Sequence, residues 1–404
     1  MSTAKIFTRT IVLLGLVSLF TDISSEMLYP VMPVYLKSIG YSALWIGVLE
    51  GLAEGTAGLS KSYFGKLSDD KGRRMPFVSF GYFLSALSKP LIILFVQPLW
   101  IMGCRITDRL GKGIRTGARD AVLGDNCAPE NRGKVFGFHR GMDTLGAAIG
   151  PFLALLWLGL HPGEYRPLFI AAFLPALIGV GCTMLVKEKK ITSPPASEKR
   201  SFWGFLTYWK KSPVGFRRLV SGLFFFALFN SSDVFLLLMA KQQGLSDQLV
   251  IGAYVFYNLV YALFSYPFGW LGDKWGMKVS FCLGLLFFAI TYTGLAMGVS
   301  VTGTFVLFFV YGLYAAATDG VSKAWISKLV PSSEGGAAQG FNAGMTSLAT
   351  LFASFFAGLI WTFHEGTVAF LISAAAAALV GIYLVAGTRE KTTAPSSGTL
   401  QAQE

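Results

Sequence analysis

The sequence predicts an all-α membrane protein in which twelve transmembrane helices form two pseudo-symmetric six-helix halves. Composition is the first reason, because 53% of the 404 residues are hydrophobic and 14% are charged, whereas a soluble domain carries about 25% charged residues. The second reason is that the apolar residues fall into twelve segments, each near the ~20 residues that a helix needs to cross a bilayer. The third is an internal repeat that relates the two halves of the chain.

Two pairs of matching stretches establish this repeat. GKLSDDKGRR, beginning at Gly65, matches GWLGDKWGMK, beginning at Gly269. GFHRGMDTLGA, beginning at Gly137, matches GFNAGMTSLAT, beginning at Gly340. In membrane proteins built from parallel repeats, the expected binding site lies between the halves near the bilayer midplane.

The chain divides into two apolar halves, a linker and a tail. The first half, 1–186, contains predicted helices at 10–36, 44–67, 76–96, 105–120, 134–159 and 168–186. Residues 187–218 contain nine Lys or Arg against two Glu, which predicts a basic cytoplasmic linker where a short amphipathic helix could lie on the inner leaflet. The second half, 219–388, contains helices at 219–240, 250–271, 278–298, 304–327, 340–361 and 367–387, and a disordered tail covers 389–404.

The distribution of basic residues predicts the orientation of these helices. Lys5, Arg9, the linker, Arg389 and the loops after helices 2, 4 and 8 place positive charge on one side, while the opposite loops are short and nearly uncharged. By the positive-inside rule, both termini are cytoplasmic. The net charge of +12 is therefore attributed to cytoplasmic loops, and we expect no nucleic-acid partner. The first apolar run lacks a cleavage site, so we expect it to remain as an anchor.

Helix 4 carries an unusual concentration of charge for a predicted membrane helix. On a helix with about 100° per residue, six of its charged residues fall within an arc of roughly 120°: Arg105, Asp108, Arg109, Lys112, Arg115 and Arg119. Charge at membrane depth is costly and occurs mainly where it faces the bundle interior. We therefore expect this face to line a water-filled cavity and to hold an anion through Arg109, Lys112 and Arg115. An ion-pair network without an anion site, and a solvated surface helix, are the alternatives.

The first helix adds acidic residues at membrane depth. Asp22, Ser25, Glu26 and Tyr29 share one face, because their spacing is i, i+3, i+4 and i+7. If they face a partly dry cavity, Asp22 and Glu26 could take up protons near neutral pH. A permanent ion pair with the arginines of helix 4 and an interfacial cap at a helix end are the alternatives. Tyr29 is a candidate substrate contact.

Further polar candidates lie on helix 5 and in the second half. His139 and Asp143 are spaced i, i+4 on helix 5 and are read either as a proton relay or as a structural pair. The repeat replaces His139, Arg140 and Asp143 by Asn342, Ala343 and Thr346, so ionisable groups concentrate in the first half. The second half offers polar candidates for substrate binding at Asn230, Asp233, Asn258, Tyr261, Asp319 and Lys323.

Three motifs resemble those of the major facilitator superfamily, and the resemblance covers essentially the whole chain. Gly65-x3-Asp69-x2-Gly72-Arg73-Arg74 resembles the family's motif between helices 2 and 3, and its second copy keeps Gly269, Asp273, Gly276 and Lys278. Arg109-x3-Gly113-x3-Gly117 resembles the helix 4 motif. Gly146-x3-Gly150-Pro151 resembles the helix 5 motif that is associated with antiporters.

These motifs also have physical roles that concern gating. Asp69 could accept hydrogen bonds from arginines or helix amino termini at the cytoplasmic face and act as a latch, and the alternative is a solvated loop turn. Arg119, near the same face, is expected to join this gate with Asp69. Gly146 and Gly150 let two backbones approach, and Pro151 should bend helix 5.

The resemblance implies a secondary transporter that works by alternating access, as an efflux antiporter. Asp22 and Glu26 at membrane depth predict proton coupling, and the basic face of helix 4 predicts a small anionic solute. An uptake symporter for an anionic metabolite or metal chelate is the alternative, and a membrane receptor is a further one. We expect no enzyme, because the three histidines are scattered and HExxH, GxSxG and Walker motifs are absent. The four cysteines lack metal or disulfide spacing. We expect no cofactor besides the proton gradient, no metal, a monomer, and a bacterial cytoplasmic membrane.

Overall fold

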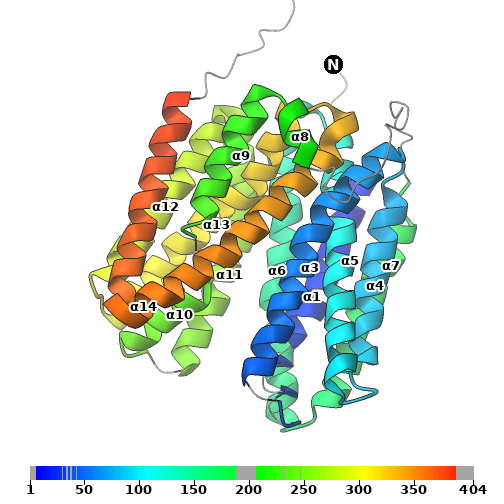
Figure 1. The fold of residues 1–404 in the computed structure, drawn as a ribbon, viewed down its shortest axis with the longest axis vertical. Coiled ribbons are helices and arrows are strands. Elements are labelled where there is room, and N and C mark those ends of the chain that lie inside the picture. Colours follow the sequence, from blue (N-terminus) through cyan, green and yellow to red (C-terminus); the bar gives the residue numbers. More distant parts are fainter. Residues whose placement is uncertain are drawn as a thin grey trace, which may run out of the picture.

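The computed structural model of the chain describes residues 6–29, 31–32, 35–36, 39–41, 43–187, 206–230, 233–245 and 247–387. These residues form two helical bundles that stand side by side, one for each half of the sequence (Figure 1). The bundles meet at the end that carries α8 (Leu206–Lys211) and separate toward the other end. We call these the closed end and the open end.

The first half contains six long helices, as the sequence predicts. Its first helix ends at Leu28, whereas the prediction extended to residue 36; the residues described beyond it do not continue α1. Helix 4 begins at Pro98, because proline at the start of a helix loses no hydrogen bond. The helices are α1 (Arg9–Leu28), α3 (Ala43–Asp70), α4 (Met75–Leu91), α5 (Pro98–Asp125), α6 (Arg132–Leu160) and α7 (Tyr165–Met184), with a short 3₁₀ turn, η1 (Pro129–Asn131), before α6.

The second half departs from the prediction at two places. The predicted helix at 219–240 is two helices, α9 (Val214–Ala227) and α10 (Asp233–Gln242), and α9 begins inside the predicted linker. The last two predicted helices belong to one element, α14 (Gly335–Gly387), whose orange part descends to the open end and whose red part returns (Figure 1). The remaining elements are α11 (Asp247–Trp275), α12 (Met277–Ala296), α13 (Val301–Leu329) and η3 (Ser332–Glu334).

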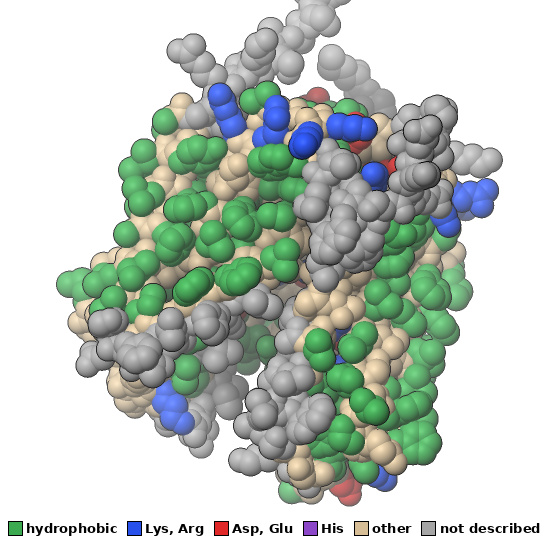
Figure 2. All heavy atoms as spheres, viewed as in Figure 1, with side chains coloured by type: hydrophobic (Ala, Val, Ile, Leu, Met, Phe, Trp, Pro, Cys, Tyr) green, Lys and Arg blue, Asp and Glu red, His purple; other side chains and the backbone are tan. Residues whose placement is uncertain are grey.

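The exterior of the bundle is apolar and its interior is charged. Six helical segments among the described residues are long and apolar enough to cross a membrane: Arg9–Leu28, Pro129–Leu160, Tyr165–Met184, Met277–Ala296, Val301–Leu329 and Gly366–Ala386. Hydrophobic side chains cover the flanks of both halves, and Lys and Arg side chains line the closed end (Figure 2). Arg109 and Arg115, by contrast, are buried. This distribution is that of a membrane protein whose charges face an internal cavity.

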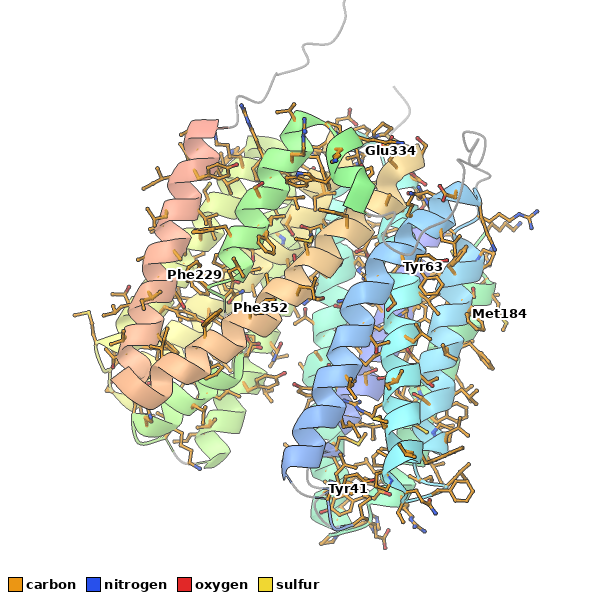
Figure 3. The ribbon with its side chains drawn as sticks, in the orientation of Figure 1. Tyr41, Tyr63, Met184, Phe229, Glu334 and Phe352 are labelled. Carbon is orange, nitrogen blue, oxygen red and sulfur yellow. The ribbon has the colours of Figure 1, made fainter. Side chains whose placement is uncertain are left out.

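Close backbone contacts join the two halves at the closed end. A Cβ atom added at Gly65 of α3 would lie 2.3 Å from the carbonyl oxygen of Gly336 in α14. The related contact is between α6 and α11, where a Cβ atom at Gly133 would lie 2.1 Å from the Gly269 carbonyl oxygen. Only glycine permits such an approach. In Figure 3, Glu334 marks the closed end and Tyr41 marks the open end of the first half.

The predicted linker and tail are covered only in part. The short helix expected in the linker corresponds to α8, where Tyr208 is buried while Lys210 and Lys211 are exposed. Residues 188–205 of the linker and the tail from 388 lie outside the described residues.

Candidate functional site

A cavity of about 560 Å³ lies between the two halves and is lined by helices of both. Because the halves separate at the open end, Figure 2 shows a hollow between them there. The first half contributes most of the positive charge of the lining, and the second half contributes only one basic residue. The charged lining residues are Lys61, Arg109, Lys112, Arg115, Arg119, Arg140 and Lys323, together with Asp22, Glu26, Asp108, Asp143, Asp233 and Asp319.

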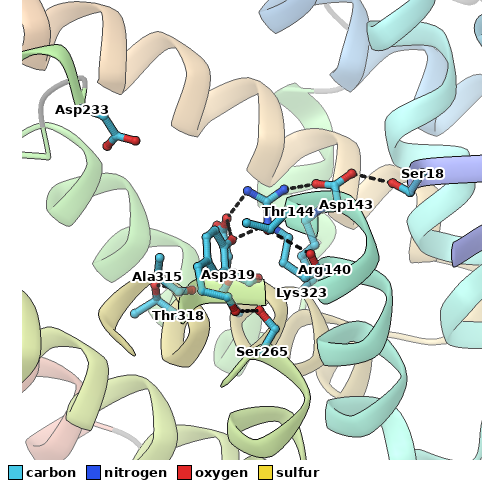
Figure 4. A network of polar contacts seen from close by, with 12 residues as sticks. Ser18, Arg140, Asp143, Thr144, Asp233, Ser265, Ala315, Thr318, Asp319 and Lys323 are labelled. Atoms are coloured by element: carbon cyan, nitrogen blue, oxygen red, sulfur yellow. Dashed lines mark hydrogen bonds and ion pairs between the residues drawn. The ribbon is translucent and has the colours of Figure 1, made fainter. Parts of the chain in front are cut away.

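Arg140 of α6 is the centre of a polar network that joins the halves (Figure 4). Its guanidinium pairs with Asp143 on the same helix and, at 2.7 Å, with Asp319 of α13. It also donates to the hydroxyl of Tyr261 of α11, which itself donates to Asp319. Ser18 of α1 completes the network by donating to Asp143 at 2.5 Å. The network holds α1, α6, α11 and α13 together in this conformation.

Asp22 and Asp143 form a carboxyl pair at the wall of the cavity. Asp22 is one helical turn beyond Ser18, which donates to Asp143, and a Cβ atom at Gly146 of α6 would lie 3.0 Å from the Asp22 Cβ atom. Two neighbouring carboxyl groups in a partly desolvated wall favour protonation of one of them. Glu26, one helical turn along α1, and Lys112 of α5 line the same cavity. The arrangement therefore combines a proton position with a neighbouring cation.

The basic residues of α5 are used in different ways. Lys112 is exposed to the cavity and makes no ion pair with the residues that the structure describes. Arg115 donates to the hydroxyl of Ser85 at 2.7 Å and lies 4.3 Å from the ring centre of Tyr82. Arg119 pairs with Asp120 at 2.9 Å. Arg119 also donates to the Tyr82 hydroxyl at 3.3 Å, and its place in the gate with Asp69 stays a prediction.

A smaller space of about 40 Å³ lies inside the first half. Lys89 of α4 is buried there, 3.9 Å from Asp108 and within hydrogen-bond distance of Ser25. Tyr29 lines this smaller space and is absent from the lining of the central cavity, so the structure does not bring it to the other predicted substrate contacts.

His139 is also outside the central cavity. Its side chain is buried, and no group in the described part of the chain hydrogen-bonds to its Nε2 atom. Although His139 and Asp143 share a face of α6, the carboxylate of Asp143 is directed to Arg140 and Ser18. A relay through His139 thus stays a prediction that these contacts do not support.

The second half presents a wall of tyrosines around Asp233. Tyr257 and Tyr311 each donate their hydroxyl to a different oxygen of Asp233, Tyr311 at 2.6 Å. Asn230 donates to the hydroxyl of Tyr314 at 2.8 Å. Asn258 also lines the cavity, and its side-chain amide donates to the Tyr254 carbonyl at 3.0 Å. Lys323 pairs at 2.9 Å with Asp120 of the first half.

The closed end is fastened by Asp69, which caps the amino terminus of α14. Its carboxylate accepts from the backbone amides of Gly336, at 3.2 Å, and Ala337, at 2.7 Å. Arg74, whose side chain is 0% exposed, pairs with Asp69 at 2.6 Å and also with Asp125. It donates in addition to the backbone carbonyl of Ser332. The geometry is that of the latch predicted from the sequence.

Asp273 makes the related contact in the second half. It accepts from the backbone amides of Gly133, at 2.9 Å, and Lys134, at 2.8 Å, at the amino terminus of α6. Lys328 of α13 pairs with it at 3.0 Å. Each half therefore caps a helix of the other half, where a carboxylate is favoured by the helix dipole. We call these contacts the Asp69 latch and the Asp273 latch.

The remaining predicted gating residues have structural roles. Gly146 and Gly150 bring α6 against α1, because a Cβ atom there would lie 2.5 Å from the Leu19 carbonyl oxygen and 2.7 Å from that of Ile23. Gly72 has a positive φ of 60°, which allows the turn between α3 and α4. Arg73 is exposed, and Pro151 lies inside α6.

Sequence reasoning missed several members of the site. The sequence gives Arg140 no role beyond the repeat comparison, yet it contacts both halves. Lys89 is not among the sequence candidates, although a lysine inside an apolar segment is the same kind of signal that identified helix 4. Among the described residues, no group of three or more His, Cys, Asp or Glu could hold a metal ion, and the four cysteines are free.

A family model and a relative of nearly full length indicate the same family. The chain matches the family model of the Major Facilitator Superfamily twice, over residues 14–259 and 219–403. An uncharacterized MFS-type transporter of Methanocaldococcus jannaschii is 32% identical over 377 residues, which cover 90% of this chain and 93% of the relative.

Two relatives with more specific names match a smaller part. Citrate exporter 1 of Aspergillus niger is 25% identical over 187 residues, 42% of this chain and 35% of that protein. The class H tetracycline resistance protein of Pasteurella multocida is 29% identical over 187 residues, 45% of each chain.

Solved structures share the fold. The human organic anion transporter MFSD10 has a TM-score of 0.76 and 17% identity, covering 93% of this chain and 99% of that one. The MFS transporter FucP in the outward conformation has a TM-score of 0.77 and 12% identity, covering 94% and 98%.

Proposed function

The chain belongs to the Major Facilitator Superfamily, and we propose that it is a proton-coupled secondary transporter for a small anionic solute, working as an efflux antiporter. The observation that carries this proposal is the Asp22–Asp143 carboxyl pair beside Lys112 in the wall of the central cavity. The pair offers a position for a proton, and Lys112 offers a cation that no described residue pairs with. A transported proton and an anionic solute would thus bind within one cavity.

The direction of transport is proposed from the relatives and the motifs. Two relatives bear the names of an exporter and of a resistance protein. Gly146 and Gly150, from the motif associated with antiporters, pack α6 on α1, the two helices that carry the carboxyl pair. Loading a solute from the cytoplasm and exchanging it for an external proton is the cycle that fits these features.

Proton-driven symport is the second candidate, and the position of Lys112 favours it. Lys112, Asp22 and Glu26 line the same cavity. Protonation of the two carboxylates would remove negative charge that repels an anion at Lys112, so that proton and solute would bind together. In reconstituted vesicles, antiport predicts solute movement against the direction of proton movement, and symport predicts movement in the same direction.

The proton role is tested by replacing the carboxylates with amides. Asp22→Asn and Glu26→Gln should abolish pH-driven accumulation of labelled citrate or succinate in proteoliposomes, while exchange at equal pH continues. Glu164→Gln is the matched control, because Glu164 lies between α6 and α7 with 57% of its side chain exposed. Retention of pH-driven accumulation in both cavity variants would make these carboxylates structural and leave Asp143 as the next candidate.

The anion role is tested on α5. Lys112→Gln should weaken anion binding by about 1–3 kcal/mol, because a charge-assisted bond is lost. Arg115→Gln should weaken binding less, since Arg115 is already bonded to Ser85 and stacked on Tyr82. Isothermal calorimetry with citrate measures both affinities. Unchanged affinity in the Lys112 variant would reopen neutral and cationic substrates.

We further propose that the closed end is cytoplasmic, that both termini lie there, and that the protein works as a monomer in a bacterial cytoplasmic membrane. The basic linker 187–218 leads into α8 at the closed end, in agreement with the positive-inside rule. An impermeant thiol reagent outside the cell should label a cysteine at Gly163 and leave one at Ser197 unlabelled. The reverse pattern would invert the topology.

A further inference from the structure

The wall formed by the second half differs in chemistry from the wall that carries Lys112. Arg109, Lys112 and Arg115 of α5 offer hydrogen-bond donors to the cavity, because Lys and Arg side chains have no acceptor. The opposite wall contains Asp233, which lies apart from the Arg140 network in Figure 4. No cationic residue in the described part of the chain pairs with Asp233, whereas Asp319, the other carboxylate on this wall, is paired with Arg140.

The two hydroxyl groups next to Asp233 already donate to it, and acceptor positions remain. Tyr257 and Tyr311 give their protons to the two oxygens of Asp233. A carboxylate has about four lone-pair positions, so each oxygen can accept another hydrogen bond. Asn230, which also lines the cavity, turns its Nδ2 to Tyr314, and no described residue donates to its Oδ1 atom. These acceptor positions favour a ligand group that donates several hydrogen bonds.

Aromatic rings complete the surroundings of these acceptors. Tyr254, Tyr257, Tyr311 and Tyr314 all line the cavity, with centroid distances of 5.3, 5.2 and 5.3 Å between successive rings. Ring faces attract cations, and a half-buried carboxylate without a cationic partner does so more strongly. Lys112, Tyr254 and Asp233 line one cavity of about 560 Å³, so a single small molecule can contact both walls.

We propose that the transported solute is dipolar: its anionic group binds Lys112, and an ammonium group binds Asp233 within the tyrosine wall. This inference rests on the proposed function, because it adds a cationic group to the anionic solute. An ammonium group carries three donors and one positive charge. It would satisfy the free positions on Asp233 and on Asn230 Oδ1 and would supply the charge that Asp233 lacks.

The test uses solutes that share an anion and differ in one substituent. Suitable triplets are succinate, malate and aspartate; propionate, 3-hydroxypropionate and β-alanine; and ethyl phosphate, 2-hydroxyethyl phosphate and phosphoethanolamine. Binding to the purified wild-type protein is measured by thermal shift and calorimetry. In at least one triplet the ammonium compound should bind about tenfold more tightly than the other two, because a charged hydrogen bond is gained.

Variants then assign the preference to Asp233. Asp233→Asn should remove the ammonium preference while anion binding remains, and Lys112→Gln should weaken all three members of the triplet. Tyr311→Phe retains both the ring and the carboxylate and should keep the preference. Thr318→Val is the matched control, since Thr318 lines the same wall and its hydroxyl donates to the backbone carbonyls of Tyr314 and Ala315 on its own helix.

Three results would overturn the proposal. Equal binding within every triplet of the wild-type protein would remove the ammonium site without need of any variant, and so would a hydroxyl compound that binds as tightly as its ammonium analogue. An ammonium preference that survives in Asp233→Asn would place the cation elsewhere. If no member of any triplet binds, the anionic substrate of the proposed function fails as well.

Discussion

The Asp69 latch and the Asp273 latch occupy related positions, yet their ionic contacts differ. In both, a carboxylate caps the amino terminus of a helix in the other half through two backbone amides. In the Asp69 latch the cation is Arg74, which is fully buried and joins Asp69, Asp125 and a backbone carbonyl. In the Asp273 latch the cation is Lys328, whose side chain is 27% exposed.

The repeat differs at a basic position next to each latch. Arg74 of the first copy aligns with Lys278 of the second. Lys278 donates to the backbone carbonyl of Val385 at 2.8 Å. The repeat thus determines which helix end each carboxylate caps, while the neighbouring basic residue determines how strongly each contact is reinforced. We expect the Asp69 latch to contribute more to the closure of this end.

The largest effect is expected from Asp69→Asn. It leaves the buried Arg74 with Asp125 as its acidic partner and should destabilise the closed end by about 3 kcal/mol. Asp273→Asn should cost about 1 kcal/mol, because Lys328 is partly solvated. The measurement is the labelling rate, from the closed-end side, of a cysteine at Ala315, which lines the cavity. Equal rates in the two variants would remove the proposed asymmetry.

Replacing Gly65 or Gly269 by alanine should destabilise the closed end to a similar extent. Gly65→Ala and Gly269→Ala would place a Cβ atom 2.3 and 2.1 Å from a carbonyl oxygen of the other half, and overpacking of this kind costs about 2 kcal/mol. Both variants should raise labelling at Ala315 to a similar extent. A much larger effect of Gly65→Ala would show that the two backbone contacts between the halves, like the two ion pairs, differ in strength.

The fold could be predicted because hydropathy and the repeat are properties of long segments. Local breaks were not predictable from them: α1 ends at Leu28, and α9 and α10 divide one apolar segment, although the apolar pattern continues. Likewise, charge within apolar segments identified Asp22, Glu26 and Lys112 as cavity residues. The pairing of Arg140 with Asp319 joins two helices distant in sequence, and helical spacing holds no information on such a contact.

Exchanging the diverged basic residues should sharpen the comparison. Arg74→Lys keeps the charge but loses the planar fork that reaches several acceptors, and should destabilise the closed end by about 1.5 kcal/mol. Lys278→Arg should change it by less than about 0.5 kcal/mol, as is usual for substitutions near the surface. Labelling at Ala315 again provides the comparison. If Lys278→Arg slows labelling strongly, an arginine at position 278 reinforces the Asp273 latch as Arg74 reinforces the Asp69 latch.

A small effect is expected from the linker helix α8, which contacts the chain directly beside the Asp69 latch. Burial raises the pKa of Tyr208 in α8, and Glu334 acts in the same direction. The hydroxyl therefore keeps its proton and donates to Glu334 at 3.2 Å, directly before α14 begins.

Tyr208→Phe retains the ring contacts with Phe216 and Phe341 and loses one hydrogen bond, so the closed end should weaken by about 0.5–1 kcal/mol. Tyr383→Phe is the control, since its hydroxyl donates at 3.4 Å to the Arg218 carbonyl within the second half. Labelling at Ala315 should rise a few-fold in the Tyr208 variant and stay constant in the control. Because Glu334 precedes the helix end that Asp69 caps, the effect of Tyr208→Phe should shrink when Asp69→Asn is already present. Full additivity of the two substitutions would mean that α8 acts on the closed end independently of the Asp69 latch.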